Sequence, residues 1–171
     1  SEWIQVGRPI DWIKPEVSAF EDNALAMSLD GKVVAIGQTQ DDSTVDFSGR
    51  VALYKDNEFF GWTPFGDNID IGDDPEGALF GYSVSLNEDG KVVAIGDPGD
   101  GFSRSKGRAF IYECNETLWQ LKGNVISPVD DGEEDVYAGR SVSLSADGNT
   151  VAVEMQIKAR TPGPPTFARV L

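Results

Sequence analysis

The chain has 171 residues, of which 40% are hydrophobic and 10% aromatic, and this is enough to build one packed domain. Its formal net charge of −15 disfavours nucleic acid and anionic membranes as partners, and it favours cations, basic proteins or simple solubility. The absence of histidine and the single cysteine exclude histidine triads, histidine metal ligands and internal disulfides. No apolar run reaches the roughly 18–20 residues of a membrane helix, so we expect no membrane insertion.

The first predicted element, at 3–10, contains a tryptophan, a glycine four residues later and an isoleucine three residues after that. This spacing occurs three times, at Trp3/Gly7/Ile10, Trp62/Gly66/Ile69 and Trp119/Gly123/Ile126. We interpret each copy as the outer strand of a small sheet. The repeated spacing predicts that the tryptophans belong to the core, and a platform for carbohydrate or peptide is the alternative.

The next element is a hairpin, which also occurs three times, at 24–37, 83–96 and 141–154. Its Asp-Gly turn recurs from Asp30 to Asp89 to Asp147, in steps of 59 and 58 residues. Asp-Gly supplies the positive φ angles of a tight turn. Strand 83–86 alternates serine with apolar residues, which predicts a small face near a central axis and an opposite face that packs in the core.

A third element follows the first two hairpins, at 49–54 and 107–112, and each copy is entered from a glycine. Each period therefore holds four short strands. Four strands per period, repeated along the chain, are typical of the blades of a β-propeller. We predict an all-β fold, a segment of about three four-stranded propeller blades.

The expected boundaries are an outer strand at 3–10, blade one at 20–71, blade two at 78–128 and a partial blade three at 136–171. Residues 167–171 resemble a degenerate third strand, and strand 3–10 would supply the missing outer strand and lock blade three. A propeller typically closes with 4 to 8 blades. The chain is then a piece of a larger propeller, a subunit that associates with copies of itself, or an open stack.

Two motifs of blade two resemble the FG-GAP repeat of integrin α-like propellers: Phe80-Gly81 before its first strand, and Gly96-Asp97-Pro98 after its second. The resemblance covers roughly 3–153. Blade one has Glu21-Asp22 in place of Phe-Gly, and blade three has Ala138-Gly139. The calcium loop found in many such blades is not expected here, because the Asp-Gly connection is too short for alternating carboxylates.

Most acidic residues fall in the loops that would share one end of the blades. We expect this acidic loop face to capture cations or a basic partner, and the alternative is solvated loops that maintain solubility. Any calcium would bind at the two densest clusters, for which plain acidic linkers are the alternative. These clusters are Asp70, Asp73, Asp74 and Glu76, and Asp130, Asp131, Glu133 and Asp135.

Other polar residues are given mostly structural roles. We expect Arg50 and Arg108, which repeat after a glycine, to pair with loop carboxylates rather than a ligand. Asn115-Glu116-Thr117 matches the N-glycosylation sequon on an exposed turn. Cys114 has no histidine to activate it and is expected to be inert.

The favoured function is a non-catalytic binding or adhesion scaffold that uses the acidic loop face of a β-propeller to hold a protein or glycan ligand, outside the cell or at its surface. The alternative is a fragment of a propeller hydrolase that acts on carbohydrate polymers, since paired carboxylates can hydrolyse glycosides. No pair has the apolar surroundings that would raise one pKa, so we expect no enzyme activity. A third alternative is an incomplete copy with no independent function.

Overall fold

The computed structural model describes residues 2–5, 7–10, 23–39, 49–72, 79–99, 106–128 and 135–158. In these ranges the chain forms β-strands and no helix, and so no helix that could cross a membrane. The prediction of an all-β fold is confirmed. The strands are β1 (Asn23–Met27), β2 (Val33–Gln38), β3 (Arg50–Asn57), β4 (Gly61–Pro64), β5 (Ser83–Leu86), β6 (Val92–Asp97), β7 (Arg108–Asn115), β8 (Leu118–Leu121), β9 (Asp135–Leu144) and β10 (Val151–Lys158).

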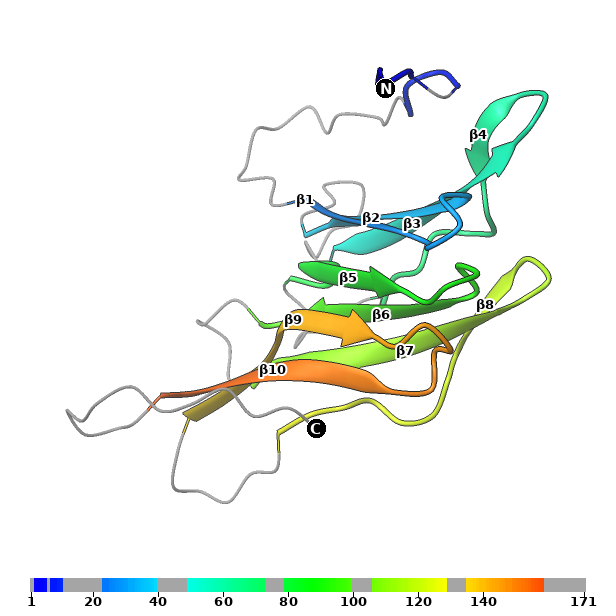
Figure 1. The fold of residues 1–171 in the computed structure, drawn as a ribbon. Helices are drawn as coiled ribbons and strands as arrows, with labels where there is room; N and C mark the ends of the chain where they lie inside the picture. Colours follow the sequence, from blue (N-terminus) through cyan, green and yellow to red (C-terminus); the bar gives the residue numbers. More distant parts are fainter. Residues whose placement is uncertain are drawn as a thin grey trace.

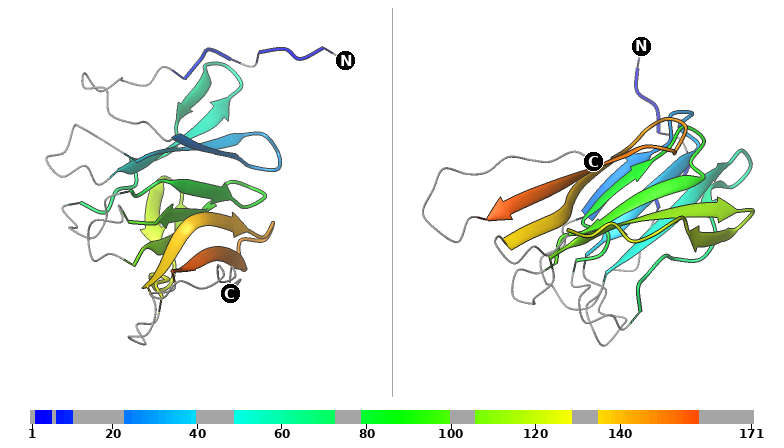
Figure 2. Two further views of the ribbon diagram at one scale, coloured as in Figure 1. Left: turned by 90° about the vertical axis from the view of Figure 1, so that its left-hand side faces the viewer. Right: turned by 90° about the horizontal axis from the view of Figure 1, so that it is seen from below.

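The strands form three antiparallel sheets that follow the sequence repeat. The first sheet has the order β1-β2-β3-β4, the second β5-β6-β7-β8, and the third holds β9 and β10. Figures 1 and 2 show the sheets stacked one on another in chain order. The predicted outer strands are only partly regular: after β4, Ile69 returns to pair with Val51, and after β8, Ile126 pairs with Ala109.

Each hairpin turn is locked by its aspartate side chain. The Oδ1 atoms of Asp30, Asp89 and Asp147 accept hydrogen bonds of 3.0–3.1 Å from the backbone N–H two residues later. Only the glycine after each aspartate has a positive φ, at 71°, 69° and 68°. The expectation that Asp-Gly supplies positive φ is met by the glycine alone, and the aspartate closes the turn through its side chain.

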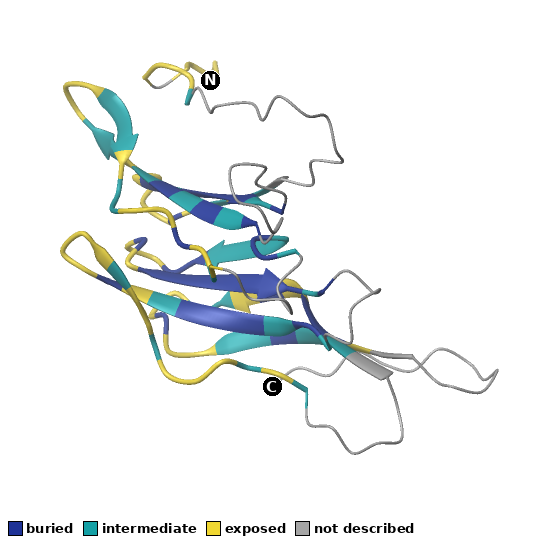
Figure 3. Cartoon of the chain, turned by 180° about the vertical axis from the view of Figure 1, so that it is seen from behind, coloured by how far each residue is buried: buried dark blue, intermediate teal, exposed yellow. Residues whose placement is uncertain are grey.

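Two apolar cores lie between the three sheets. Val33, Ala35, Val51 and Leu53 of the first sheet pack against Leu86, Val93, Ile95 and Phe110 of the second. The opposite side of the second sheet, with Val92, Ala94, Ala109 and Ile111, packs against Val142, Val153 and Met155 of the third. The second sheet is thus covered on both faces, and Figure 3 shows its buried central strands.

Adjacent sheets approach one another closely through their backbones. A Cβ atom on Gly37 would clash with the carbonyl oxygen of Gly81, just before the first strand of the next sheet, and one on Gly96 would clash with the carbonyl oxygen of Gly139. The predicted small face of β5 serves this approach: Ser83 Oγ donates a 2.9 Å hydrogen bond to the Gly139 carbonyl oxygen. Any side chain at Gly37 or Gly96 would separate the sheets.

The N-terminal residues depart from the prediction. Residues 2–5 and 7–10 form no strand, and Gly7 lies beside Gly61 of the first sheet, with 3.2 Å from its Cβ position to the Cα atom of Gly61. The segment is at the end of the stack far from β9 and β10 (Figure 1), so it does not lock the third sheet of its own chain. The prediction of a core position for Trp3 is also wrong, because its relative exposure is 103%. Residues 167–171 lie outside the described residues.

Candidate functional site

Most of the acidic residues predicted to bind calcium lie outside the described residues: Asp73, Asp74, Glu76, Asp130, Asp131 and Glu133. Asp135 begins β9. Asp70 is exposed, and its Oδ1 accepts a hydrogen bond of 3.1 Å from the Gly72 N–H. The described residues include no group of three or more acidic or cysteine side chains that could hold a metal ion.

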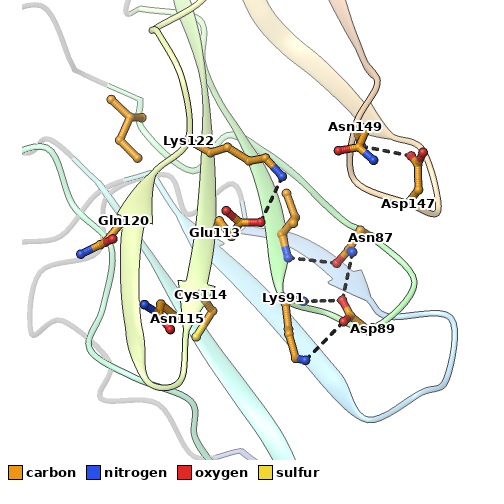
Figure 4. Close-up of a pocket in the computed structure, with 12 residues that line it drawn as sticks. Asn87, Asp89, Lys91, Glu113, Cys114, Asn115, Gln120, Lys122, Asp147 and Asn149 are labelled. Carbon is orange, nitrogen blue, oxygen red and sulfur yellow. Dashed lines mark hydrogen bonds and ion pairs between the residues drawn. The ribbon is translucent and has the colours of Figure 1, made fainter.

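A hollow lies at the other end of the sheets, where the hairpin turns are. It has a volume of about 530 Å³ and is open to solvent between β8, the turn after β5 and the turn after β9. Figure 4 shows side chains from these elements around it. Nine of its 12 lining residues are polar or charged: Asn87, Asp89, Lys91, Glu113, Asn115, Gln120, Lys122, Asp147 and Asn149. The other three are Val92, Cys114 and Leu121.

One wall of the hollow is the turn of the second sheet. Asn87 is buried, and its Oδ1 accepts a 2.9 Å hydrogen bond from the Val92 N–H while its Nδ2 donates one of 2.9 Å to Asp89. Lys91 Nζ lies 3.6 Å from Asp89 Oδ2. Partial burial opposes ionisation of Asp89, but the donors from Lys91 and Asn87 outweigh it and lower the pKa of the carboxyl. The wall is therefore rigid and carries a stable negative charge.

The opposite wall comes from β7, β8 and the residue that follows β8. Glu113 and Lys122 form an ion pair of 3.1 Å between Oε1 and Nζ. Gln120 pairs with Glu113 across the two strands, and its side chain is exposed. Asn115, the residue of the glycosylation sequon, ends β7 and is also exposed, as predicted.

Cys114 contributes its side chain to the lining but is only 8% exposed. Burial raises the pKa of its thiol, which keeps the sulfur neutral and weakly nucleophilic. Its Sγ donates a 3.4 Å hydrogen bond to the Glu116 carbonyl oxygen. These features agree with the expected inert role.

The two repeated arginines each contact the last residue of the preceding strand. Arg108 Nη2 forms an ion pair of 3.0 Å with Oδ2 of Asp97, as predicted, although Asp97 ends strand β6 rather than lying in a loop. Arg50 Nε donates a 2.8 Å hydrogen bond to Oε1 of Gln38, which ends β2. The second sheet therefore has a carboxylate where the first has an amide.

Asp97 is the most strongly buried acid of the described residues, with 0% exposure. Burial raises the pKa of its carboxyl, against the opposing effect of Arg108 and of the Leu79 and Gly99 N–H donors at 3.3 Å. A carboxyl with a raised pKa is a candidate general acid when a substrate can reach it. Asp97 is sealed from solvent, so its role is to join the strands and not to meet a substrate.

Sequence reasoning missed this hollow. It predicted that the hairpin turns share one end of the sheets, but it looked for binding at the end with more acidic residues. The signal was the alternation that begins in β8, where Gln120 and the following Lys122 both lie beside Glu113 of β7. Seeing it required the third sheet, whose Asp147 and Asn149 complete the lining.

The arrangement offers hydrogen-bond donors and acceptors together. Lysine ammonium and amide N–H groups donate, while carboxylate and amide oxygens accept, and the apolar part of the lining is small. Such a surface suits a ligand that is itself rich in polar groups. Comparison with known protein families finds no family model that matches the chain, and no curated protein matches it significantly.

Proposed function

We propose that this chain is a non-catalytic binding module that holds a protein or glycan partner, and that its three sheets are consecutive β-propeller blades of the FG-GAP type. The observation that carries the proposal is the polar hollow between the second and third sheets. Small-molecule sites are mostly apolar, whereas this lining is mostly amide, carboxylate and ammonium groups. A glycan hydroxyl or a polar peptide can find a donor or an acceptor on each wall.

The propeller part of the proposal is supported by the stacking. Each complete sheet has its strands in sequence order, and successive sheets approach through Gly37 and Gly81 and through Gly96 and Gly139. The hairpin turns are also joined in series, since the Leu29 N–H donates to the Glu88 carbonyl and the Glu88 N–H to the Ala146 carbonyl. A regular inter-sheet junction is what a ring of blades requires.

The non-catalytic part is supported by how the acids near the hollow are used. Asp89 closes its turn, Glu113 pairs with Lys122, and Asp147 accepts hydrogen bonds within its own turn. At Asp89 and Asp147 these contacts lower the pKa and stabilise the charged form, whereas glycoside hydrolysis needs one acid kept protonated. Recognition by hydrogen bonds needs no such shift.

The acidic loops offer a second surface for a basic partner, with Asp67 and Asp70 exposed between β4 and β5. The sequon at Asn115 supports a location outside the cell or at its surface, where a glycan would be added beside the hollow. A glycan on Asn115 would then narrow access to the hollow from the side of β7.

The test is binding of the full chain to a panel of immobilised oligosaccharides and to polylysine, at low and high salt. Gln120→Trp fills the hollow from an exposed position of β8. Thr63→Trp is the matched control, because Thr63 takes the same place in β4 of the first sheet. We expect Gln120→Trp to weaken glycan binding by about tenfold or more, and Thr63→Trp to leave it unchanged.

The proposal fails if no oligosaccharide binds and polylysine does not bind either, or if the two variants weaken binding equally. Hydrolysis of any oligosaccharide in the panel would favour the carbohydrate hydrolase instead. Binding to polylysine that disappears at high salt would assign the partner site to the acidic loops.

A further inference from the structure

A second pocket lies between the second and third sheets, at the opposite end of the strands from the polar hollow. Its volume is about 250 Å³. The hollow is lined by Asn87, which follows β5, whereas this pocket is lined by Tyr82, which precedes β5. The pocket is therefore a site separate from the hollow.

The described lining of this pocket comes from both sheets. The second sheet and its adjoining turns contribute Leu79, Tyr82, Pro98 and Gly99, and the third sheet contributes Tyr137, Arg140 and Gln156. None of these seven residues carries a carboxylate, whereas the lining of the hollow includes Asp89, Glu113 and Asp147. The described lining thus combines one positive charge with two aromatic rings, in a chain whose net charge is −15.

Arg140 is the charged group of the pocket. It lies in β9 and is exposed, and within the ranges that the structure describes its guanidinium has no hydrogen-bond or ion-pair partner. Arg108 and Lys122, by contrast, are paired with carboxylates. A guanidinium binds a carboxylate through two parallel N–H donors. The donors of Arg140 therefore favour a ligand that carries a carboxylate.

The two tyrosines favour a ligand with a ring. Tyr82 and Tyr137 are both half-buried in the lining, and Leu79 and Pro98 add apolar surface beside them. A tyrosine offers an apolar ring face together with a hydroxyl that donates or accepts a hydrogen bond. The volume is below the roughly 300–1,000 Å³ of most small-molecule sites, so the pocket has room for one small unit.

The buried ion pair of Asp97 and Arg108 holds the pocket in shape. Oδ1 of Asp97 accepts hydrogen bonds of 3.3 Å from the backbone N–H groups of Leu79 and Gly99, and both of these residues line the pocket. Oδ2 of the same carboxylate pairs with Arg108 at 3.0 Å. This wall is positioned before a ligand binds, which lowers the entropy cost of binding.

An acidic residue next to the lining limits the charge that a ligand can carry. Glu154 lies opposite residues 139–141, where the register of β9 and β10 shifts, and its Oε1 accepts a 3.0 Å hydrogen bond from Gln156 Nε2. The charge of Glu154 and the net charge of the chain both repel anions. A ligand with a single carboxylate is repelled less than a polyanion.

We propose that this pocket binds a sugar acid, a sugar ring that carries one carboxylate. Arg140 binds the carboxylate, the rings of Tyr82 and Tyr137 pack against the C–H groups of the sugar, and the amide oxygen of Gln156 accepts a hydrogen bond from a sugar hydroxyl. Asp97 is a positioning residue, because it holds the wall and does not contact the ligand. The proposal depends neither on the polar hollow nor on the propeller.

The experiment is an NMR titration of the full ¹⁵N-labelled chain with glucuronate, glucose and acetate at neutral pH and constant ionic strength. Glucose has the ring without the carboxylate, and acetate has the carboxylate without the ring. We expect glucuronate to shift the backbone amide signals of Gly99 and Arg140, and to bind about tenfold or more tightly than either of the other two. The signals of Asn87 and Asn149 in the hollow should not move.

Arg140→Gln should weaken glucuronate binding by about tenfold or more, because the amide that replaces the guanidinium carries no charge. Arg8→Gln is the matched control: Arg8 is exposed in the segment at 7–10, outside the pocket, and its replacement changes the net charge by the same amount. Glu154→Gln should tighten binding, because it removes a negative charge beside the pocket. The amide spectrum of each variant reports whether the fold is kept.

Three results would overturn the proposal: glucuronate shifts no signal, Arg140→Gln and Arg8→Gln weaken binding equally, or acetate binds as tightly as glucuronate. Shifts confined to Asn87 and Asn149 would also overturn it and would place the sugar in the hollow. Binding in the hollow is tested separately with Gln120→Trp, so the two sites can fail independently.

Discussion

The backbone carbonyl oxygen of Gly139 in the third sheet lies so close to Gly96 of the second sheet that a Cβ atom on Gly96 would clash with it. Gly96 has no positive φ, so the requirement for glycine is a matter of space between two backbones. The same relationship between Gly37 and Gly81 joins the first and second sheets. The close stacking of the sheets therefore requires glycine at two positions of the repeat, Gly37 and Gly96.

Gly96→Ala should lower the free energy of unfolding by about 3 kcal/mol or more, because the second and third sheets must separate and the bond from Ser83 Oγ to Gly139 is lost. Denaturant unfolding measures the change. Gly72→Ala is the control: it has a φ of 62° but open space around it, so it should cost about 1 kcal/mol. Equal losses for the two variants would contradict the close approach.

Trp119→Phe should lower the free energy of unfolding by about 1 kcal/mol, the value of one neutral hydrogen bond. The Trp119 Nε1–H donates a 2.8 Å hydrogen bond to the Phe65 carbonyl oxygen, and phenylalanine keeps an aromatic ring there without a donor. Trp3→Phe, at the exposed copy of the repeat, should change stability by less than about 0.5 kcal/mol. An effect of the same size at both positions would mean that the inter-sheet hydrogen bond contributes nothing.

Arg108→Met should destabilise the fold by about 3–5 kcal/mol at neutral pH, because it leaves the buried Asp97 carboxylate without its ion-pair partner. Without the guanidinium the pKa of Asp97 rises further above its ordinary value. A carboxyl whose pKa is raised by folding stabilises the folded state at pH values below its pKa in the unfolded chain. This stabilisation is lost as the pH rises through the pKa of the carboxyl in the folded state. The cost of the substitution should therefore shrink as pH falls from about 7 to about 4, as measured by thermal unfolding.

The double variant Asp97→Asn with Arg108→Met serves as the control for this pair. It removes both charges, so its stability should depend less on pH than that of Arg108→Met. A loss for Arg108→Met that stays constant with pH would show that the contact of the guanidinium with the Phe110 ring, 5.3 Å from Cζ to the ring centroid, accounts for the effect rather than the ion pair with Asp97.

Acid should destabilise the hairpin turns. The hydroxyl groups of Ser28 and Ser145 donate hydrogen bonds of 2.6 Å and 2.5 Å to Asp30 and Asp147, and these bonds hold the pKa of each carboxyl below its ordinary value of 3.8. A carboxyl whose pKa is lowered by folding stabilises the folded state at pH values above its pKa in the unfolded chain. This stabilisation is lost as the pH falls through the pKa of the carboxyl in the folded state. The melting temperature should therefore fall between about pH 5 and pH 2, and fall less in the double variant Asp30→Asn with Asp147→Asn.

The direct measurement is an NMR titration of the carboxyl carbons. In Ser28→Ala the pKa of Asp30 should move toward its ordinary value while that of Asp147 stays where it is. Movement of both, or of neither, would contradict the assignment of the shift to the serine hydroxyls.

Local patterns predicted the strands and their order well. The alternation in 83–86 and the apolar run after each Asp-Gly turn place β5, β6 and their counterparts, because each pattern is complete within a few residues. The Trp/Gly/Ile spacing correctly indicated outer strands at β4 and β8. It did not indicate that Trp3, which has the same spacing, is exposed, because the exposure of a tryptophan depends on which segments pack against it.

The candidate site was predicted less well. The number of acidic residues in the loops led to the prediction of a calcium site there. Of the eight predicted ligands, Asp70 alone lies where the structure describes the surroundings of the side chain. Its carboxylate accepts a hydrogen bond from the backbone of its own turn. The polar hollow draws on β7, β8 and two turns about 60 residues apart. No local pattern relates Gln120 to Asn149, because their proximity arises only when the third sheet packs on the second.

The sequence by itself determined the repeat, the all-β class, the turn positions and the alternation of inward and outward residues, because these depend on the backbone preferences of neighbouring residues. Only the tertiary structure decided which glycines are required by contact, which tryptophan is left exposed, that Asp97 is sealed with Arg108, and where a ligand has room. Those outcomes depend on the distance between separate sheets, and that distance is set by packing across the whole stack.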